Sequence, residues 1–243
     1  ATHRPEDFEG MRKAGRLAAE VLDLLVPEVK PGVTTEALDK LAYDYVTAHG
    51  ALPACVGYRG YRHTLCTSIN HVVCHGIPSD RPLKDGDIIN IDVTVIVDGW
   101  HGDTSRMYYV GDVKRKAQRL VEITYEAMMR GIAVAKPGAT TGDIGYAIQS
   151  FAEDQERCSV VRDFCGHGLG RIFHDAPNIL HYGKPNTGPL LKYTSRPGAR
   201  LASEILSVFT GPHGAAGAVA LGIGAAVAVP LLLPLLLRLA DGW

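Results

Sequence analysis

The sequence predicts an α+β protein built from two related halves, and two observations lead to this prediction. First, residues 30–35 (Lys-Pro-Gly-Val-Thr-Thr) recur as residues 136–141 (Lys-Pro-Gly-Ala-Thr-Thr), each time between a long helical pattern and a shorter one. Second, residues 88–110 alternate as a strand pair does. A duplicated unit usually packs about a pseudo-dyad, with a cleft between its copies. The alternative is a chance match, because Lys-Pro-Gly is a common helix terminator.

The helices are predicted from their apolar spacing and their end signals. Apolar residues recur at helical spacing over 5–29, with acidic residues in the first turn. A second helix is expected from its N-cap, Thr34, to Gly50, which suits a helix C-terminus. The second copy of the repeat predicts a matching pair of helices over 114–134 and 142–154.

The strand pair reads as a β-hairpin that carries two carboxylates. Asp98-Gly99 is a strong two-residue turn between strands 88–97 and 100–110. This turn sets Asp92 opposite Ser105 and Asp103 opposite Thr94. Asp92 and Asp103 are then diagonal neighbours on one face, about 7–8 Å apart at the backbone. The Ile and Val residues of the other face are expected to pack against helices.

Two carboxylates that converge on a half-buried face repel each other unless positive charge lies between them. A metal ion or a shared proton would relieve this repulsion. The alternative is a solvated polar face with two unrelated aspartates.

Three histidines lie in glycine-rich surroundings that are more typical of a site than of a core: His75, His167 and His174. Singly, each could be a structural or surface residue. The segment 163–174 is neither an H-E-x-x-H helix nor a dinucleotide-binding loop, and a cysteine protease centred on Cys165 is a weaker alternative. Carboxylates with one imidazole suit Mn, Fe, Co or Zn, and pairs of such metals activate water for hydrolysis.

Composition argues against several other classes of protein. Lys and Arg number 25 against 26 Asp and Glu, so no net field attracts nucleic acid or anionic lipid. The five cysteines are odd in number and scattered, which indicates reduced thiols in a cytoplasmic protein. The first residues have no apolar stretch behind them, so a secretory signal is not expected.

Four segments together closely resemble the type I methionine aminopeptidase family: residues 74–78 (Cys-His-Gly-Ile-Pro), 85–92 (Asp-Gly-Asp-Ile-Ile-Asn-Ile-Asp), 102–105 (Gly-Asp-Thr-Ser) and 165–170 (Cys-Gly-His-Gly-Leu-Gly). The resemblance runs from about residue 5 to about residue 192. It implies the pita-bread fold, in which two pseudo-symmetric halves surround a curved, mostly antiparallel sheet. That fold agrees with the internal repeat.

Carried over residue by residue, the resemblance implies a site with two divalent metal ions. Asp92 would be a bidentate ligand of one metal, Asp103 would bridge both, and His167 would bind the second. His174 would stabilise the tetrahedral intermediate, and His75 would contact the scissile region of the substrate. The side chains matching the family's methionine pocket are Cys55, Tyr58, Tyr61, Cys66 and Phe173.

The implied reaction removes the initiator methionine from a nascent polypeptide when the next residue is small. We expect a cytoplasmic monomer that meets nascent N-termini, with the ribosome as a further partner and no nucleic-acid specificity. The alternatives are a pita-bread module that binds nascent chains without cleaving them, and a prolidase-like peptidase of different specificity.

The resemblance divides the chain into a catalytic part, residues 1–192, and an atypical apolar part, residues 193–243. The family's two glutamate ligands are not matched there, because its Thr-Ile-Glu-Pro motif is absent. Glu204 follows Gly198 at the spacing by which Asp92 follows Gly86, so it is the candidate fourth ligand; the other interpretation is a stray glutamate.

Three origins for this part compete: a reading-frame change, a membrane segment, or divergence with the fold retained. Residues 215–237 are an uncharged run of 23 residues, long enough to cross a bilayer.

Overall fold

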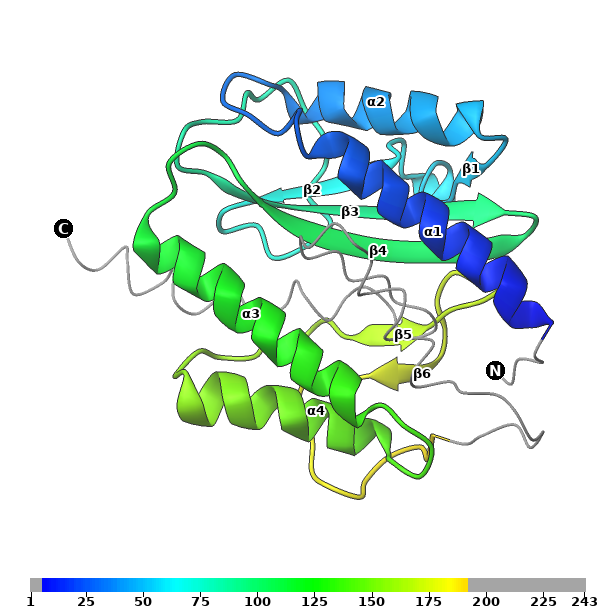
Figure 1. Ribbon diagram of the computed structural model, residues 1–243, viewed down its shortest axis with the longest axis vertical. Coiled ribbons are helices and arrows are strands. Elements are labelled where there is room, and N and C mark those ends of the chain that lie inside the picture. Colours follow the sequence, from blue (N-terminus) through cyan, green and yellow to red (C-terminus); the bar gives the residue numbers. More distant parts are fainter. Residues whose placement is uncertain (1–5, 192–243) are drawn as a thin grey trace.

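The computed structural model describes residues 6–191 and arranges them as two pairs of helices with strands between them (Figure 1). The first pair is α1 (Asp7–Leu25) and α2 (Thr35–Ala48), and the second is α3 (Arg115–Val134) and α4 (Thr141–Gln149). A π-helical segment, η2 (Ser150–Gln155), continues α4. The strands are β1 (Leu52–Pro53), β2 (Leu65–Ile69), β3 (Ile88–Val97), β4 (Trp100–Tyr109), β5 (Gly166–Gly168) and β6 (Asp175–Ile179), and a 3-10 turn, η1 (Tyr58–Gly60), follows β1. The predicted α+β class is confirmed.

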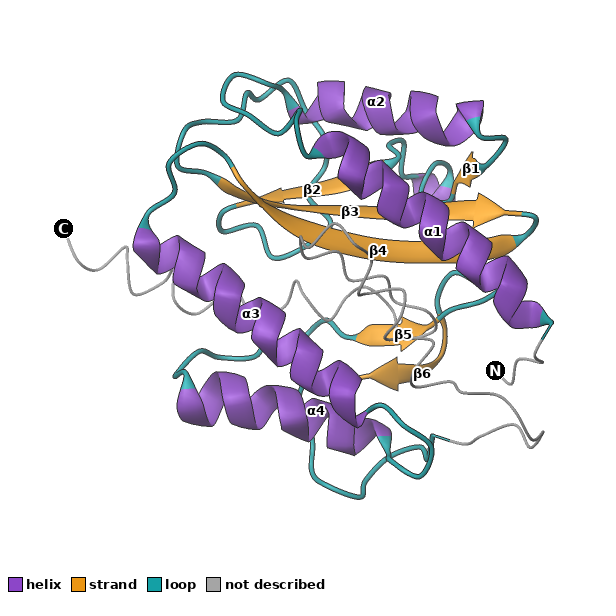
Figure 2. Ribbon diagram, viewed as in Figure 1, coloured by secondary structure: helices purple, strands orange, loops and turns teal. Residues whose placement is uncertain are grey.

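The larger sheet is organised around β3, and all its pairings are antiparallel (Figure 2). Along one edge, β3 pairs with β4 over its whole length. Along the other edge it pairs first with β2 and then with the short β1. The loop between β1 and β2 therefore leaves the sheet and returns to the same edge, so residues from both of its ends lie beside the middle of β3. A separate antiparallel pair, β5 and β6, lies between this sheet and the second pair of helices (Figure 1).

The β3–β4 hairpin has the predicted register. Asp92 pairs with Ser105, and Thr94 pairs with Asp103. The turn residues Asp98 and Gly99 have φ of 51° and 78°, as a type I′ turn requires. Aspartate and glycine tolerate this conformation better than most residues, which explains why two residues suffice to set the register of ten pairs.

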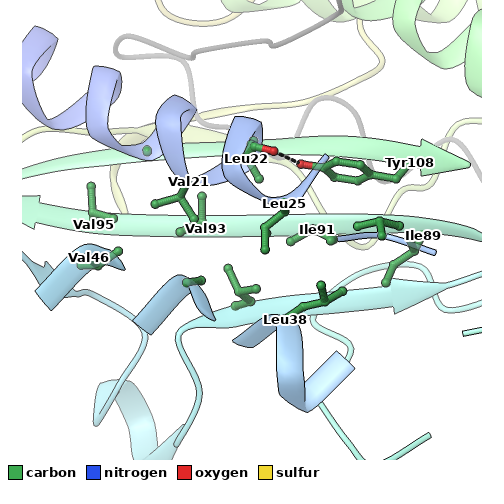
Figure 3. Packing of buried hydrophobic residues seen from close by; sticks show 14 of the residues in the cluster. Val21, Leu22, Leu25, Leu38, Val46, Ile89, Ile91, Val93, Val95 and Tyr108 are labelled. Atoms are coloured by element: carbon green, nitrogen blue, oxygen red, sulfur yellow. Dashed lines mark hydrogen bonds between the residues drawn. The ribbon is translucent and has the colours of Figure 1, made fainter. Parts of the chain in front are cut away.

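One face of the hairpin packs against the first pair of helices. Ile89, Ile91, Val93 and Val95 are fully buried beneath side chains of α1 and α2, among them Val21, Leu22, Leu25, Leu38 and Val46 (Figure 3). Burying each such side chain contributes about 1.5–3 kcal/mol. The Tyr108 hydroxyl donates a hydrogen bond of 2.7 Å to the Leu22 carbonyl, which satisfies the one polar atom this ring brings into the core.

The opposite face of the hairpin is also buried. Thr94 is 2% exposed and Asp103 5% exposed. The alternative of a solvated polar face is therefore wrong, because the second half of the chain covers the side that a single hairpin would leave to water.

The internal repeat corresponds to a structural repeat. Gly32 and Gly138 both have positive φ, 89° and 93°. The Gly32 N–H donates to the Leu83 carbonyl at 2.8 Å, and the Gly138 N–H donates to the Leu191 carbonyl at 2.9 Å. Matching backbone contacts between segments so far apart in sequence favour duplication over a chance match.

The threonines that end each copy of the repeat cap the next helix. The Thr34 hydroxyl accepts a hydrogen bond from the N–H of Ala37, and that of Thr140 accepts one from Asp143. Only the second copy has a complete capping box, because the Asp143 carboxylate also accepts a hydrogen bond from the Thr140 N–H at 2.7 Å. Within residues 6–191, no helix is both long and apolar enough to span a bilayer. Residues 215–237 lie outside the described part of the chain.

Candidate active site

The carboxylates of the hairpin and the imidazole of β5 meet where the two halves face each other. The His167 Nε2 atom lies 3.4 Å from the Asp103 Oδ2 atom. The other oxygen of Asp103 accepts a 2.9 Å hydrogen bond from the Thr94 hydroxyl, which fixes the carboxylate on the face of the hairpin. Asp92 lies on the same face, and its Oδ1 atom is buried without a hydrogen-bond partner. These are the first three metal ligands that the sequence proposed.

The protonation of His167 suits a metal ligand. Its Nδ1 atom lies 2.9 Å from the Gly168 carbonyl oxygen. Because a carbonyl only accepts, Nδ1 must carry a proton. In the metal-free protein the Nε2 atom donates toward Asp103, and loss of that proton would free its lone pair for a metal. Metal-binding histidines are commonly oriented in this way by a carbonyl behind the ring.

The electrostatics of this cluster favour the binding of a cation. Burial raises the pKa of Asp92 well above its usual range, and the charge of Asp103 raises it further. Burial lowers the pKa of His167, but hydrogen bonds to Asp103 and to the Gly168 carbonyl outweigh this effect, so the net shift is upward. Both shifts reflect acidic oxygens gathered in a buried place, where an added positive charge is favourable.

The donor chemistry fits a divalent metal, because it combines an unpartnered buried oxygen, a second carboxylate and an imidazole nitrogen. The shell they form is incomplete. Among residues 6–191, no three or more His, Cys, Asp or Glu side chains are close enough together to hold an ion. Further donors must therefore join these three, and the predicted fourth ligand, Glu204, lies outside the described residues.

His174 lies beside this cluster. Its ring centroid is 4.4 Å from that of His167, and its Nδ1 atom is 3.0 Å from the Tyr58 hydroxyl. Burial lowers the pKa of His174, and the neighbouring His167 lowers it further. Burial likewise lowers the pKa of His75, although Asp103 opposes this shift. Both rings are therefore neutral at neutral pH, a form that can donate one hydrogen bond.

The residues predicted to hold the methionine side chain lie on the loop between β1 and β2, on β2 itself and on the segment before β6. The Cys55 thiol hydrogen-bonds to Cys66, which pairs with Asp92 across β2 and β3. The Tyr61 hydroxyl donates to the Leu65 carbonyl at 2.8 Å. The Tyr58 ring packs on Phe173 with centroids 5.0 Å apart. The hydrogen bond to Cys66 and burial raise the pKa of Cys55, so this thiol is neutral. The neutral Cys55 thiol and the aromatic rings make a surface that accepts an apolar, sulfur-containing side chain.

Sequence reasoning missed two residues near this site. Thr94, which orients Asp103, is an ordinary polar residue of an alternating strand. His101 was assigned no role, because it does not lie in a glycine-rich motif like the one that surrounds His167. Its ring stacks on Phe173 with centroids 5.6 Å apart, a contact between segments separated by about seventy residues along the chain. No sequence signal available in a single chain identifies such a contact.

Comparison with known proteins agrees with this geometry. The model of a protein family described as metallopeptidase family M24 matches residues 9–219. The chain belongs to metallopeptidase family M24. A methionine aminopeptidase from Rickettsia prowazekii is 62% identical over 190 residues, which cover 78% of this chain and 73% of that protein.

Solved structures of M24 proteins confirm the pita-bread fold. The crystal structure of methionine aminopeptidase from Rickettsia prowazekii matches with a TM-score of 0.78 and 61% identity, covering 79% of this chain and 77% of that one. The prolidase from Pyrococcus furiosus matches with a TM-score of 0.67 over 78% of this chain and 53% of that one. At 22% identity, the prolidase shares the fold alone. The resemblance to methionine aminopeptidases inferred from the sequence is therefore confirmed.

Proposed function

We propose that this M24 protein is a methionyl aminopeptidase that removes the initiator methionine from nascent proteins whose second residue is small. The observation that carries the proposal is the approach of His167 to within 3.4 Å of Asp103, on the face of the hairpin where Asp92 has a buried oxygen without a hydrogen-bond partner. Relatives up to 62% identical that are named methionine aminopeptidases support the choice of substrate. A likeness of 22% identity gives the prolidase alternative no support beyond the shared fold.

In this proposal two divalent metal ions, Co, Mn, Fe or Zn, are held by Asp92, Asp103, His167 and Glu204. When bound, such ions would supply an activated water molecule as the nucleophile for hydrolysis of the first peptide bond. Glu204 falls within the residues that the family model matches, which supports its inclusion. The carbonyl behind His167 and the hydroxyl beside Asp103 hold two of the ligands in place before a metal arrives.

The neutral imidazoles carry the rest of the chemistry. When the Tyr58 hydroxyl donates to Nδ1 of His174, the proton of that ring is on Nε2. An Nε2–H group can donate a hydrogen bond to the oxygen on which charge develops during attack, and one such donor is worth about 10²–10³ in rate. His75, which burial keeps neutral, would contact the scissile region. The Cys55, Tyr58, Tyr61, Cys66 and Phe173 side chains would hold methionine.

The proposed domains are a catalytic part, residues 1–192, and an atypical apolar part, residues 193–243. The preferred origin of the apolar part is a reading-frame change that replaced the strands bearing the family's glutamates, and Glu204 serves as the fourth ligand only if this part is diverged family sequence instead. Translating the encoding DNA in the other frames beyond codon 192 should reveal Thr-Ile-Glu-Pro. A gene with no such motif in any frame would leave a membrane segment or divergence as the explanation.

The proposed partners are nascent polypeptide N-termini at the ribosome, met by a cytoplasmic monomer. All five cysteines are free thiols in the structure, which supports a reducing compartment.

The decisive experiment measures methionine release from Met-Ala-Ser by the purified chain with added Co²⁺ or Mn²⁺. We expect metal-dependent release that Asp103→Asn abolishes and that Asp98→Asn, on the same hairpin, leaves unchanged. Binding of the peptide without release would favour the non-catalytic module. Cleavage confined to X-Pro substrates would favour the prolidase alternative. Loss of release in Glu204→Gln would support Glu204 as a ligand, and full activity would exclude it.

A further inference from the structure

The tip of the β3–β4 hairpin holds the loop that precedes His174. The backbone N–H of His101 donates to the Gly170 carbonyl at 2.9 Å, and the Nδ1 atom of the same residue lies 3.0 Å from that oxygen. Because a carbonyl only accepts, Nδ1 of His101 carries a proton and donates it. One residue of β4 thus binds one carbonyl twice.

The imidazole of His101 begins a stack that ends at His174. Its ring lies 5.6 Å from the Phe173 ring, at 23° to it. The Phe173 ring lies 4.2 Å from the His174 ring, again at 23°. Tyr58 closes the other side of His174 with its 3.0 Å contact to Nδ1. His174 is therefore placed between a ring stack that starts on the hairpin and a hydroxyl from the β1–β2 loop.

The tip of the hairpin is itself held in place by packing against α1. Trp100 packs over Gly10 of α1 so closely that a side chain at Gly10 would overlap the indole. The guanidinium of Arg171 lies over the Trp100 ring, 4.2 Å from its centroid, and adds a second attachment of the loop to the tip. A loop attached at two points to a packed strand has little freedom to move, so the residues that follow it are held in place.

From these contacts we infer that His101 is a positioning residue, which sets the place of His174 through the Gly170 carbonyl and the Phe173 ring. The inference rests on the proposed function for the chemistry of His174, but the contacts themselves do not depend on it. Histidine suits the position because it supplies a flat ring for the stack and an N–H donor at Nδ1. Phenylalanine would keep the ring and lose the donor, and asparagine would keep a donor and lose the ring.

The first test compares His101→Ala with wild type in the methionine-release assay. We expect kcat to fall about 10- to 100-fold, because misplacing a catalytic group by about 1 Å costs up to about 10²-fold. Divalent-metal uptake should stay within about twofold of wild type, since His101 contacts none of the proposed ligands. KM should rise less than kcat falls, because the Phe173 ring on which His101 stacks also lines the methionine pocket. His101→Asn should recover part of the lost kcat through its amide donor. Equal loss in kcat and metal uptake would overturn the inference in favour of a general structural defect.

His49→Ala is the matched control. The Nδ1 atom of His49 also lies against a carbonyl, that of Tyr45 at 2.8 Å, and its ring packs on the Tyr45 ring at 4.2 Å. It caps α2, away from the site, so its loss should leave kcat unchanged. A double-mutant cycle adds a stricter test: in a His174→Ala background, His101→Ala should cost no further kcat. An undiminished loss there would show that His101 does not act through His174.

A spectroscopic readout keeps the inference testable without activity. In metal-free wild type, imidazole ¹⁵N spectra should show His174 as one neutral tautomer with its proton on Nε2. In His101→Ala the His174 signal should shift toward the position of a mixture of the Nδ1–H and Nε2–H tautomers. His49→Ala should leave this signal unchanged. Absence of methionine release by wild type would refute the proposed function alone, whereas an unchanged His174 signal in His101→Ala would refute the positioning role.

Discussion

Replacing Asp92 by asparagine should stabilise the metal-free protein while removing its response to metal. The carboxylate has a buried, unpartnered oxygen and lies close to a second carboxylate. Asparagine has nearly the same shape but no charge, and its amide can donate to Asp103 as protonated Asp92 would. The substitution therefore removes a buried like-charge repulsion and keeps the packing of β3.

The size of the effect follows from the burial of this group. Leaving one buried polar atom unsatisfied costs about 1–3 kcal/mol. A gain near 2 kcal/mol would raise Tm by about 4–8 °C in a domain of this size. Because the pKa of Asp92 is raised on folding, the metal-free wild type loses stability as pH rises from 3.8 through the raised value. The advantage of asparagine should thus be larger at about pH 8 than at about pH 5.

Thermal unfolding with a chelator measures the stability of the metal-free protein, and thermal unfolding with Mn²⁺ measures its stabilisation by metal. At a metal concentration of about 100 Kd, wild type should gain about 2.7 kcal/mol, and Asp92→Asn should gain little. Asp98→Asn is the control: its carboxylate is 71% exposed in a solvent-facing pair with Lys13, so neither effect should appear. A metal-free Asp92→Asn protein that is less stable than wild type, or one that keeps the full metal response, would refute the reasoning.

Three further predictions concern stability. Gly102→Ala should lower the free energy of unfolding in urea by about 1–3 kcal/mol, because the new methyl group would overlap the backbone of Ala14 in α1; an unchanged midpoint would contradict that packing. Thr140→Ala should cost roughly 1–2 kcal/mol and Thr34→Ala roughly 0.5–1, since only the former breaks a capping box; equal losses in urea would contradict this. The buried His181 has neither ring nitrogen hydrogen-bonded, and burial lowers its pKa to about 4. Its neutral form is favoured on folding, so the contribution of His181 to stability should be constant above pH 6.5 and fall by about 3 kcal/mol as pH drops to about 4. His181→Leu should remove this fall, and an unchanged slope in urea titrations across pH would refute the assignment.

The hairpin could be predicted from the sequence because its determinants are local. Strict alternation assigns each side chain to a face, and a two-residue turn sets the register, so the diagonal placement of Asp92 and Asp103 followed directly. The helix ends were predicted for the same reason, since caps such as Thr34 bond within their own turn. The repeat required only comparison of the chain with itself.

The burial of the polar face depended on distant segments. A lone hairpin leaves Asp103 to water, and only the packing of the second half against the first makes it 5% exposed. The approach of His167 to within 3.4 Å of that carboxylate likewise joins residues about sixty positions apart.

By itself, then, the sequence determined the hairpin, the helix caps, the duplication and the types of ligand, because each depends on contacts within a few residues or on side-chain chemistry alone. Tertiary structure decided which of the histidines meet the carboxylates, and it gave His101 a place at Gly170 that no local pattern indicated. Contacts across long loops depend on how every intervening element packs, and no single segment encodes that outcome.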